Sequence, residues 1–380
     1  MAQNRITELH KQGQSVWQDD ISRQMLNDGE IARNIDLGVR GLTSNPSIFE
    51  KAIAAGTAYD DAIGDLIREG RDAAGVFDAL AIADIQRACD LFRPIYDASH
   101  GRDGFASIEV SPGAARDADR TRHETRHLWT AVDRPNVMVK IPGTVECAPV
   151  IEEMLTDGIN INITLLFSIA AYERVAEAYL TALKTRQAAG KPVDRVASVA
   201  SFFVSRVDTL VDKLLDGKIA ASGDAAAKAH LASLKGKAAV ANAKLAYRSF
   251  QRHFSGPDWG RLDAAGAAVQ RPLWASTSVK NPAYRDVLYV EDLIGPETVN
   301  TMPRPTIAAF LDHGVVARTI DQDVAGAERV MRDLAAAGID MTAVTDQLED
   351  EGIATFDKAF ASLLTGVEGK REKLAEMIGA

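Results

Sequence analysis

The sequence contains little that would mark a secreted, membrane-bound or nucleic-acid-binding protein. Only two of its 380 residues are cysteines, Cys89 and Cys147, which are too few for a disulfide scaffold and fit the reducing cytoplasm, where we expect this protein. The N-terminus has no apolar core that could serve as a signal sequence. No apolar run approaches the roughly 20 residues of a membrane span. The formal net charge of -10 argues against nucleic acid as a main partner. We therefore expect neither nucleic acid nor membrane as a partner.

The sequence also lacks a glycine-rich dinucleotide loop of the form GxGxxG after any predicted strand. It has no repeat, no low-complexity block and no linker rich in Pro, Gly or Ser. What is present, 46% hydrophobic and 25% charged residues, is typical of a globular protein. We expect one domain over residues 1–380, with an N-terminal helix at 1–14 and a helical C-terminal part at 304–380.

Strand-like and helix-like segments alternate about eight times along the chain. This alternation predicts a parallel sheet, and eight repeats favour an α/β fold of the closed (β/α)8 type, a TIM barrel, over an open doubly wound sheet. The extra length over the usual 250 or so residues is expected in additional helices at 58–99 and 222–255 and in the helical C-terminal extension. The expected strands are 15–19, 36–43, 105–110, 137–141, 159–164, 195–201, 272–276 and 297–302. The expected helices are 1–14, a segment ending near 31, 47–99 with breaks near Gly56 and Gly70, 113–133, 146–157, 168–189, 203–255 with a break near 222, and 304–380.

One lysine lies inside a predicted buried strand. The segment 137–143 reads VMVKIPG, an apolar and β-branched run that Pro142 and Gly143 stop, and Lys140 is its one charged residue. Burial of an unpaired ammonium is costly and favours the neutral amine, which is a nucleophile. The other readings are an amine that reaches solvent at the strand end, or one paired with a carboxylate.

Polar residues recur with one parity near the C-terminal ends of the predicted strands. Side chains alternate along a strand, so the isoleucines of 159–163 face one side while Asn160, Asn162 and Thr164 face the other. Each polar residue taken alone has a structural explanation as a cap or a satisfied polar group. Because barrel active sites form at the C-terminal ends of several strands, the full set predicts a lysine-centred site. This set comprises Asp19, Asn45, Glu109, Lys140, Asn162, Thr164 and Ser201.

Five motifs resemble those of the transaldolase family, and their arrangement is similar to the longer bacterial type. The likeness spans about residues 15–365. The motifs are GLTSNPSIFEKAI (41–53), VMVKIPGT (137–144), ININITLLFS (159–168), ASFFVSRVD (200–208) and WASTSVKNP (274–282).

The resemblance implies a β/α barrel and a class I, lysine-dependent enzyme of the pentose phosphate pathway. It implies transfer of a dihydroxyacetone unit from fructose 6-phosphate or sedoheptulose 7-phosphate to glyceraldehyde 3-phosphate or erythrose 4-phosphate. The expected partners are therefore sugar phosphates, and no metal or organic cofactor is expected. A monomer and a homodimer both stay open.

The resemblance also implies the catalytic roles. Lys140 matches the lysine that forms a Schiff base with the substrate C2 carbonyl. Asp19, preferred over its neighbour Asp20, matches the acid/base that takes the C4 hydroxyl proton. Glu109 and Thr164 match the pair that holds a water and moves protons during carbinolamine dehydration.

The binding roles follow in the same way. Asn45 and Asn162 match residues that hydrogen-bond the dihydroxyacetone part, Ser201 a serine near the C1 hydroxyl, and Arg206 a phosphate arginine. Shorter transaldolases carry a second phosphate arginine soon after the seventh strand. Here the first cation after Ser276 is Lys280, which we assign to the second phosphate contact with Ser276 as a supporting donor. Taken singly, Arg206 and Lys280 could also be solvated surface charges.

Three other functions are considered beside a transaldolase. A fructose 6-phosphate aldolase that releases free dihydroxyacetone would use the same lysine and aspartate. A catalytically silent barrel could bind or scaffold, although it would not require this set of polar residues. The stretch from His123 through Glu124 to His127 matches the HExxH motif of a zinc peptidase, but the charged run before it marks a solvated helix and no third histidine follows at the metzincin spacing. The sequence also leaves open whether the C-terminal helices cover the barrel mouth or mediate self-association.

Overall fold

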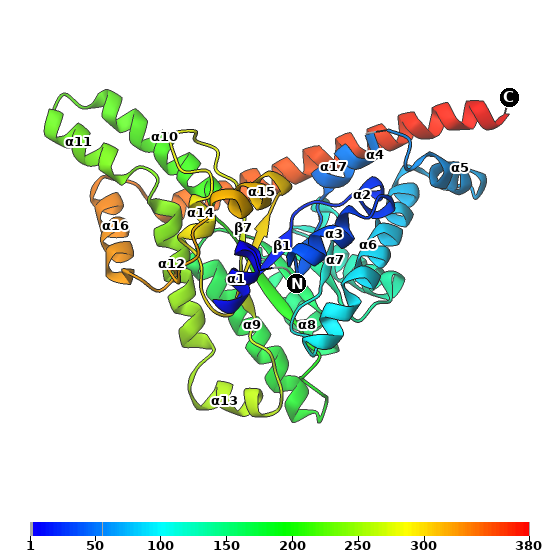
Figure 1. The fold of residues 1–380 in the computed structure, drawn as a ribbon, viewed down its shortest axis with the longest axis horizontal. Helices are drawn as coiled ribbons and strands as arrows, with labels where there is room; N and C mark the ends of the chain where they lie inside the picture. The colour runs from blue at the N-terminus through cyan, green and yellow to red at the C-terminus, as the bar shows by residue number, and fades with distance from the viewer. Residues whose placement is uncertain (1–2, 55, 380) are drawn as a thin grey trace.

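The computed structural model describes residues 3–54 and 56–379 (Figure 1). Eight parallel strands form a closed barrel in chain order, with the last strand paired to the first. The predicted (β/α)8 architecture with extra helices is therefore confirmed. The strands are β1 (Gln14–Gln18), β2 (Gly41–Thr43), β3 (Ala106–Glu109), β4 (Val137–Pro142), β5 (Ile161–Leu166), β6 (Ser198–Phe203), β7 (Arg271–Ala275) and β8 (Thr298–Met302).

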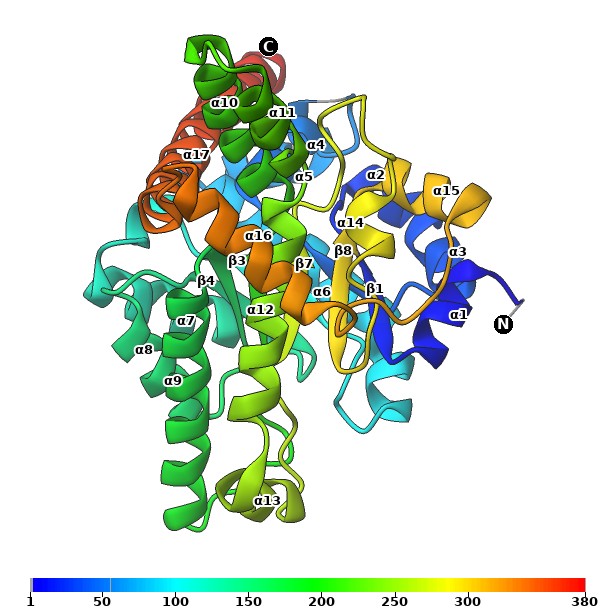
Figure 2. The ribbon, with the colours of Figure 1, turned by 90° about the vertical axis from the view of Figure 1, so that its left-hand side faces the viewer.

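Helices surround the barrel and extend from it. Figure 2 shows α9 and α12 side by side below the barrel and α16 lying against α12. The helices of the first half are α1 (Arg5–Lys11), α2 (Arg23–Asn27), α3 (Glu30–Leu37), α4 (Pro46–Ala54), α5 (Asp60–Arg68), α6 (Ala73–Ala98), the 3-10 turn η1 (Pro112–Ala114), α7 (Ala118–Val132) and α8 (Ala148–Asp157). Those of the second half are α9 (Ile169–Ala188), α10 (Ser205–Ala221), α11 (Ala225–Leu234), α12 (Ala238–His253), α13 (Gly256–Ala264), α14 (Leu288–Glu291), α15 (Arg304–His313), α16 (Val324–Ala336) and α17 (Met341–Gly379).

The strand register sets the height of the predicted polar residues in the barrel. Glu109 of β3 pairs in register with Lys140 of β4, which in turn pairs with Asn162 of β5. Ile161 and Ile163 on the alternate parity are fully buried in the hydrophobic core. Residues of one parity on neighbouring strands therefore meet on the same side of the sheet, as the alternation predicts.

Two predicted boundaries near the N-terminus are wrong. The helix expected at 1–14 ends at Lys11, and the backbone turns at Gly13, where φ is +80°, before β1 begins. The strand expected at 36–43 is shorter because α3 continues to Leu37 and ends at Gly38, which has a φ of +113°. Glycine tolerates this left-handed conformation and so ends the helix.

Other strand ends also differ from prediction. β5 runs beyond Thr164 to Leu166, through an irregular pairing at which Leu165 has a φ of +60°. β7 ends at Ala275, so that Ser276, with a φ of +56°, belongs to the loop. β6 begins three residues later and ends two residues later than the predicted strand at 195–201. Alternating hydrophobicity locates a strand, but positive φ at a non-glycine residue has no reliable sequence signal.

The helical C-terminal part consists of three helices, and the last of them crosses the barrel. Leu363 and Val367 of α17 are buried in the core. Lys370 of α17 donates hydrogen bonds to the backbone oxygens of Ile53 and Gly56, next to α4, and Figure 1 shows the two helices adjacent. The helix α17 therefore packs against α4, which follows β2 at the C-terminal end of the barrel strands. No helix in the described part of the chain is long and apolar enough to span a membrane.

Candidate active site

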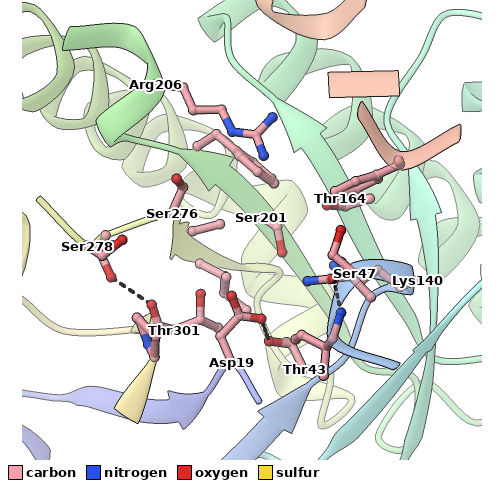
Figure 3. A pocket seen from close by; sticks show the side chains of 18 of the residues that line it. Asp19, Thr43, Ser47, Lys140, Thr164, Ser201, Arg206, Ser276, Ser278 and Thr301 are labelled. Carbon is pink, nitrogen blue, oxygen red and sulfur yellow. Dashed lines mark hydrogen bonds between the residues drawn. The ribbon is translucent and has the colours of Figure 1, made fainter. Parts of the chain in front are cut away.

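A cavity of about 350 Å³ lies at the C-terminal end of the barrel (Figure 3). All predicted site residues except Glu109 and Asn162 line it. They come from strands, from loops and from the first turn of α10 around the barrel, as a barrel active site requires. The predicted residues in its wall are Asp19, Asn45, Lys140, Thr164, Ser201, Arg206, Ser276 and Lys280.

Lys140 and Glu109 form a buried ion pair beside this cavity. The Lys140 Nζ lies 3.1 Å from the Glu109 Oε2, and the two side chains are only 6% and 5% exposed. The Lys140 amine also donates a 3.3 Å hydrogen bond to the backbone oxygen of Ser44. Burial raises the pKa of the Glu109 carboxyl, Lys140 opposes that shift, and the nearby Asp19 carboxylate adds to it. Of the readings open for Lys140, pairing with a carboxylate is the one observed.

The two neighbouring aspartates after β1 have different environments. Asp19 lines the cavity, and its Oδ1 accepts a 2.7 Å hydrogen bond from the Thr43 hydroxyl. Figure 3 shows the Asp19 and Thr43 side chains next to each other in the pocket. Asp20 instead pairs with Arg304 at 2.8 Å and is not part of the cavity wall. The geometry therefore favours Asp19 over Asp20 as the carboxylate available to a substrate.

Thr164 contributes an unusual buried hydroxyl. Its side chain is fully buried, and its Oγ1 has no hydrogen-bond partner among the described residues. A buried hydroxyl without a partner is costly, so such a group in a cavity wall is suited to bind a water or a substrate atom. Thr164 comes from β5, adjacent to the strand of Lys140.

Asn162 lies behind the cavity wall and organises a residue that does line it. Its Nδ2 donates to the Ser107 hydroxyl at 3.0 Å, and its Oδ1 accepts from the Ser201 hydroxyl at 2.7 Å. Asn45 occupies the wall itself, and its Oδ1 caps α4 by accepting a 3.0 Å hydrogen bond from the Ile48 amide. The structure therefore brings Asn45 and Ser201 to the cavity, and places Asn162 in contact with Ser201.

Arg206 is the partly buried cation of the cavity. It lies in the first turn of α10, with its guanidinium carbon 5.3 Å from the centre of the Phe203 ring. Burial lowers the pKa of Arg206, and Glu351 partly offsets this shift. Within the described residues it forms no ion pair. The Ser276 hydroxyl shares a 3.0 Å hydrogen bond with Ser205, which ties the loop after β7 to the start of α10.

Two lysines complete the positive charge at the cavity. Lys280 is exposed and donates a 2.6 Å hydrogen bond to Ser278 on its own loop. Lys51 of α4 also lines the cavity and has no ion-pair partner in the described part of the chain. Sequence reasoning missed Lys51, although its four-residue spacing from Ser47 places both on one helix face. Ser47, Ser278, Thr301 and Phe356 are further lining residues that it missed.

The HExxH residues on α7 form a different kind of cluster. The Glu124 carboxylate accepts hydrogen bonds of 2.7 Å from the Ser111 amide and from Arg120 Nε. His127 pairs with Asp78 at 2.8 Å. In the described ranges, no group of three or more His, Cys, Asp or Glu side chains could hold a metal ion. These contacts give no support to a zinc peptidase.

Comparisons with known proteins agree with the motif resemblance. Residues 16–367 match the family model described as transaldolase/fructose-6-phosphate aldolase. The chain is similar to a transaldolase of Trichodesmium erythraeum, with 44% identity over 377 residues that cover 98% of this chain and 99% of that protein. A transaldolase of a Parafrankia species is 47% identical over 371 residues, covering 97% and 98%. One of Mycolicibacterium smegmatis is 44% identical over 373 residues, covering 97% and 98%.

Proposed function

Because the chain belongs to the transaldolase/fructose-6-phosphate aldolase family, we propose that it is a transaldolase acting through a Schiff base on Lys140. The donor is a ketose phosphate, fructose 6-phosphate or sedoheptulose 7-phosphate. The acceptor is glyceraldehyde 3-phosphate or erythrose 4-phosphate. The observation that carries the proposal is the buried Lys140–Glu109 pair beside a cavity whose wall contains Arg206, Lys51 and Lys280.

The first step forms the covalent adduct. The neutral Lys140 amine attacks the donor C2 carbonyl, and loss of water from the carbinolamine gives an iminium ion. Glu109 supplies and removes the protons of this step, with the departing water held at Thr164. Burial raises the pKa of the Glu109 carboxyl, which makes its protonation during this step easier.

The second step breaks the C3–C4 bond. Asp19 takes the proton of the C4 hydroxyl, the bonding electrons move into the iminium, and the aldose phosphate leaves. Dihydroxyacetone stays on Lys140 as an enamine, whose C3 then attacks the carbonyl carbon of the acceptor. The hydrogen bond from Thr43 orients the Asp19 carboxylate toward the cavity floor for this exchange.

The binding groups divide between the two ends of the substrate. Asn45 and Ser201 hold the dihydroxyacetone hydroxyls, and Asn162 positions Ser201 by accepting a hydrogen bond from its hydroxyl group. Arg206 holds the phosphate, with Ser276 as a neutral donor. Lys280 and Lys51 are the candidates for the second phosphate contact, and each would act as a point charge.

The test is product analysis with and without an acceptor. With fructose 6-phosphate and erythrose 4-phosphate, we expect sedoheptulose 7-phosphate and glyceraldehyde 3-phosphate in equal amounts. With fructose 6-phosphate alone, we expect little turnover. Release of free dihydroxyacetone at the same rate without an acceptor would instead identify an aldolase, and absence of both products would identify a silent barrel.

A cytoplasmic location is part of the same proposal. Cys89 and Cys147 are both free and buried, as suits a reducing compartment. The expected sugar phosphates are charged metabolites, which the cation-bearing cavity is suited to bind.

A further inference from the structure

One wall of the active-site cavity comes from α17, far along the chain from the barrel strands. Thr355 and Phe356 of this helix line the cavity. The Phe356 side chain is buried, and its ring centre lies 5.9 Å from the Lys140 Nζ. An apolar ring thus lies on one side of the amine, whereas Glu109 and the Ser44 carbonyl contact the amine directly.

The residues one helical turn before and one turn after Phe356 pack against the barrel and a neighbouring helix, and so fix the position of its ring. Gly352, Phe356 and Phe360 follow at four-residue intervals and so share one face of α17. A Cβ on Gly352 would lie 2.9 Å from the Leu165 side chain, so glycine allows the helix to approach β5 closely. Phe360 packs edge-on against Phe77 of α6, with ring centres 5.7 Å apart.

The far part of α17 is anchored to the neighbouring helices. Lys370 forms a 2.6 Å ion pair with Asp60 of α5, and Ser362 donates a hydrogen bond to Glu50 of α4. These contacts lie outside the cavity. They hold the helix in place independently of the ring of Phe356.

A transferase of the kind proposed above has a specific need at this amine. Between departure of the first aldose and arrival of the second, the only water at the dihydroxyacetone enamine must be the one held at Thr164. A second water beside C3 would release the adduct: it delivers a proton to C3, the water at Thr164 bonds through its oxygen to C2 and returns one proton to the second water, its remaining proton moves to the nitrogen, the C2–N bond breaks, and free dihydroxyacetone and neutral Lys140 result. Glu109 and Thr164, which serve dehydration in one direction, would serve this hydration equally well.

We propose that Phe356 determines whether the adduct is transferred or released, by excluding additional water from the space around Lys140. The inference rests on the proposed transaldolase function and deepens it. The apolar ring offers no hydrogen bond to a water, so its removal would open the cavity at the amine to solvent. Phe356 therefore acts as a specificity-determining residue through water exclusion, and needs no bond to the substrate.

The test compares Phe356→Ala and Phe356→Leu with Phe360→Ala as the matched control. Phe360→Ala removes a phenyl ring from the same face of α17, one turn further on, and this ring lines a neighbouring cavity beside Glu109 rather than the cavity that contains Lys140. Each full-length variant is given fructose 6-phosphate, with and without erythrose 4-phosphate. The rate of dihydroxyacetone release is divided by the rate of sedoheptulose 7-phosphate formation. Borohydride trapping on Lys140 confirms that each variant still forms the adduct.

We expect Phe356→Ala to raise this ratio about tenfold or more, Phe356→Leu to raise it less, and Phe360→Ala to leave it within about twofold of the parent. If Phe356→Ala does not fold, the ratio of Phe356→Leu decides. An unchanged ratio in the folded Phe356 variants, or an equal rise in Phe360→Ala, would overturn the inference. A parent protein that transfers nothing to erythrose 4-phosphate would overturn the proposed function instead.

Discussion

Two ion pairs with little solvent exposure lie at opposite ends of the barrel, and their surroundings differ. At the N-terminal end, Arg271 and Asp103 lie 3.4 Å apart and are 12% and 13% exposed. Asp103 also accepts hydrogen bonds from the Trp17 indole at 2.9 Å and from the Ser15 hydroxyl, which in turn accepts one of 2.8 Å from Arg271. Hydrogen bonds from neighbouring side chains therefore supplement the ion pair, although both residues also line a pocket at this end of the barrel.

The pair at the C-terminal end has fewer partners. Lys140 contacts Glu109 and one backbone oxygen, and the nearby Thr164 hydroxyl has no partner within the described residues. Arginine stays charged, whereas a buried lysine can become a neutral nucleophile. The difference teaches that burial of a cation alone does not mark a catalytic site. The C-terminal pair differs in that its cation is a lysine, which can lose its proton and act as the nucleophile proposed above.

The largest contrast is expected from replacing the two cations. Lys140→Met should lower the transfer rate at least about a thousandfold, because no nucleophile remains. Arg271→Met should leave adduct formation intact in the folded fraction but destabilise the fold by about 3–5 kcal/mol, because Asp103 would stay buried without its cation. Transfer assays and denaturant unfolding of both variants check this. If Lys140→Met and Arg271→Met lost transfer activity equally, the proposed difference between the two ends of the barrel would be wrong.

Replacing the carboxylate of the active-site pair should have the next largest effect. Glu109→Gln keeps the shape but cannot move protons, so single-turnover adduct formation should slow by about 10²–10⁴-fold. Donor affinity should change much less. Rapid-quench measurement of the borohydride-trapped adduct separates the two quantities. An unchanged single-turnover rate would remove Glu109 from the proton transfers proposed for it.

Among the cations of the cavity wall, the more buried one should have the larger effect on KM when it is replaced by alanine. Arg206→Ala should raise the KM for fructose 6-phosphate by about tenfold or more, since hydrogen bonds to charged groups are worth about 1.5–3 kcal/mol. Lys280→Ala and Lys51→Ala should raise it only about two- to fivefold, because exposed charges are screened. Steady-state kinetics identify which lysine contacts phosphate. A lysine variant with unchanged KM is a surface charge.

The smallest expected effect is on stability as a function of pH. Burial raises the Glu109 pKa from its ordinary 4.5, so between that value and the folded pKa the unfolded chain loses the proton first. The free energy of unfolding should therefore fall as the pH rises through this window. The free energy of unfolding of Glu109→Gln should fall less over the same range. Urea unfolding from about pH 4 to about pH 8 measures both slopes. Parallel curves would mean that Glu109 does not contribute this dependence.

Much of the barrel could be predicted because its strands carry a strong local signal. The alternation in β5 placed Asn162 and Thr164 on one face, and the apolar run of β4 singled out Lys140. Strand ends were predicted less well. Gly38 and Ser276 have positive φ angles near the ends of strands, and the hydrophobic pattern of the sequence does not show such backbone conformations. Local sequence determines the elements, and tertiary contacts determine where they stop.

Contacts between distant segments could not be predicted. Nothing in the pattern of α17 shows that Phe356 lies beside Lys140, since an apolar helix face does not specify what it packs against. The role of Asn162 as a partner of Ser201 depends on the register of two strands. Lys51 was within reach of sequence reasoning, because it lies in the same recognised motif as Asn45, GLTSNPSIFEKAI (41–53).

Borohydride reduction in the presence of fructose 6-phosphate, followed by peptide mass mapping, tests the central claim most directly. We predict a single dihydroxyacetone-derived adduct on the peptide that contains Lys140, and none in Lys140→Met. An adduct on another lysine, or active transfer with no trapped adduct in the parent protein, would contradict the account.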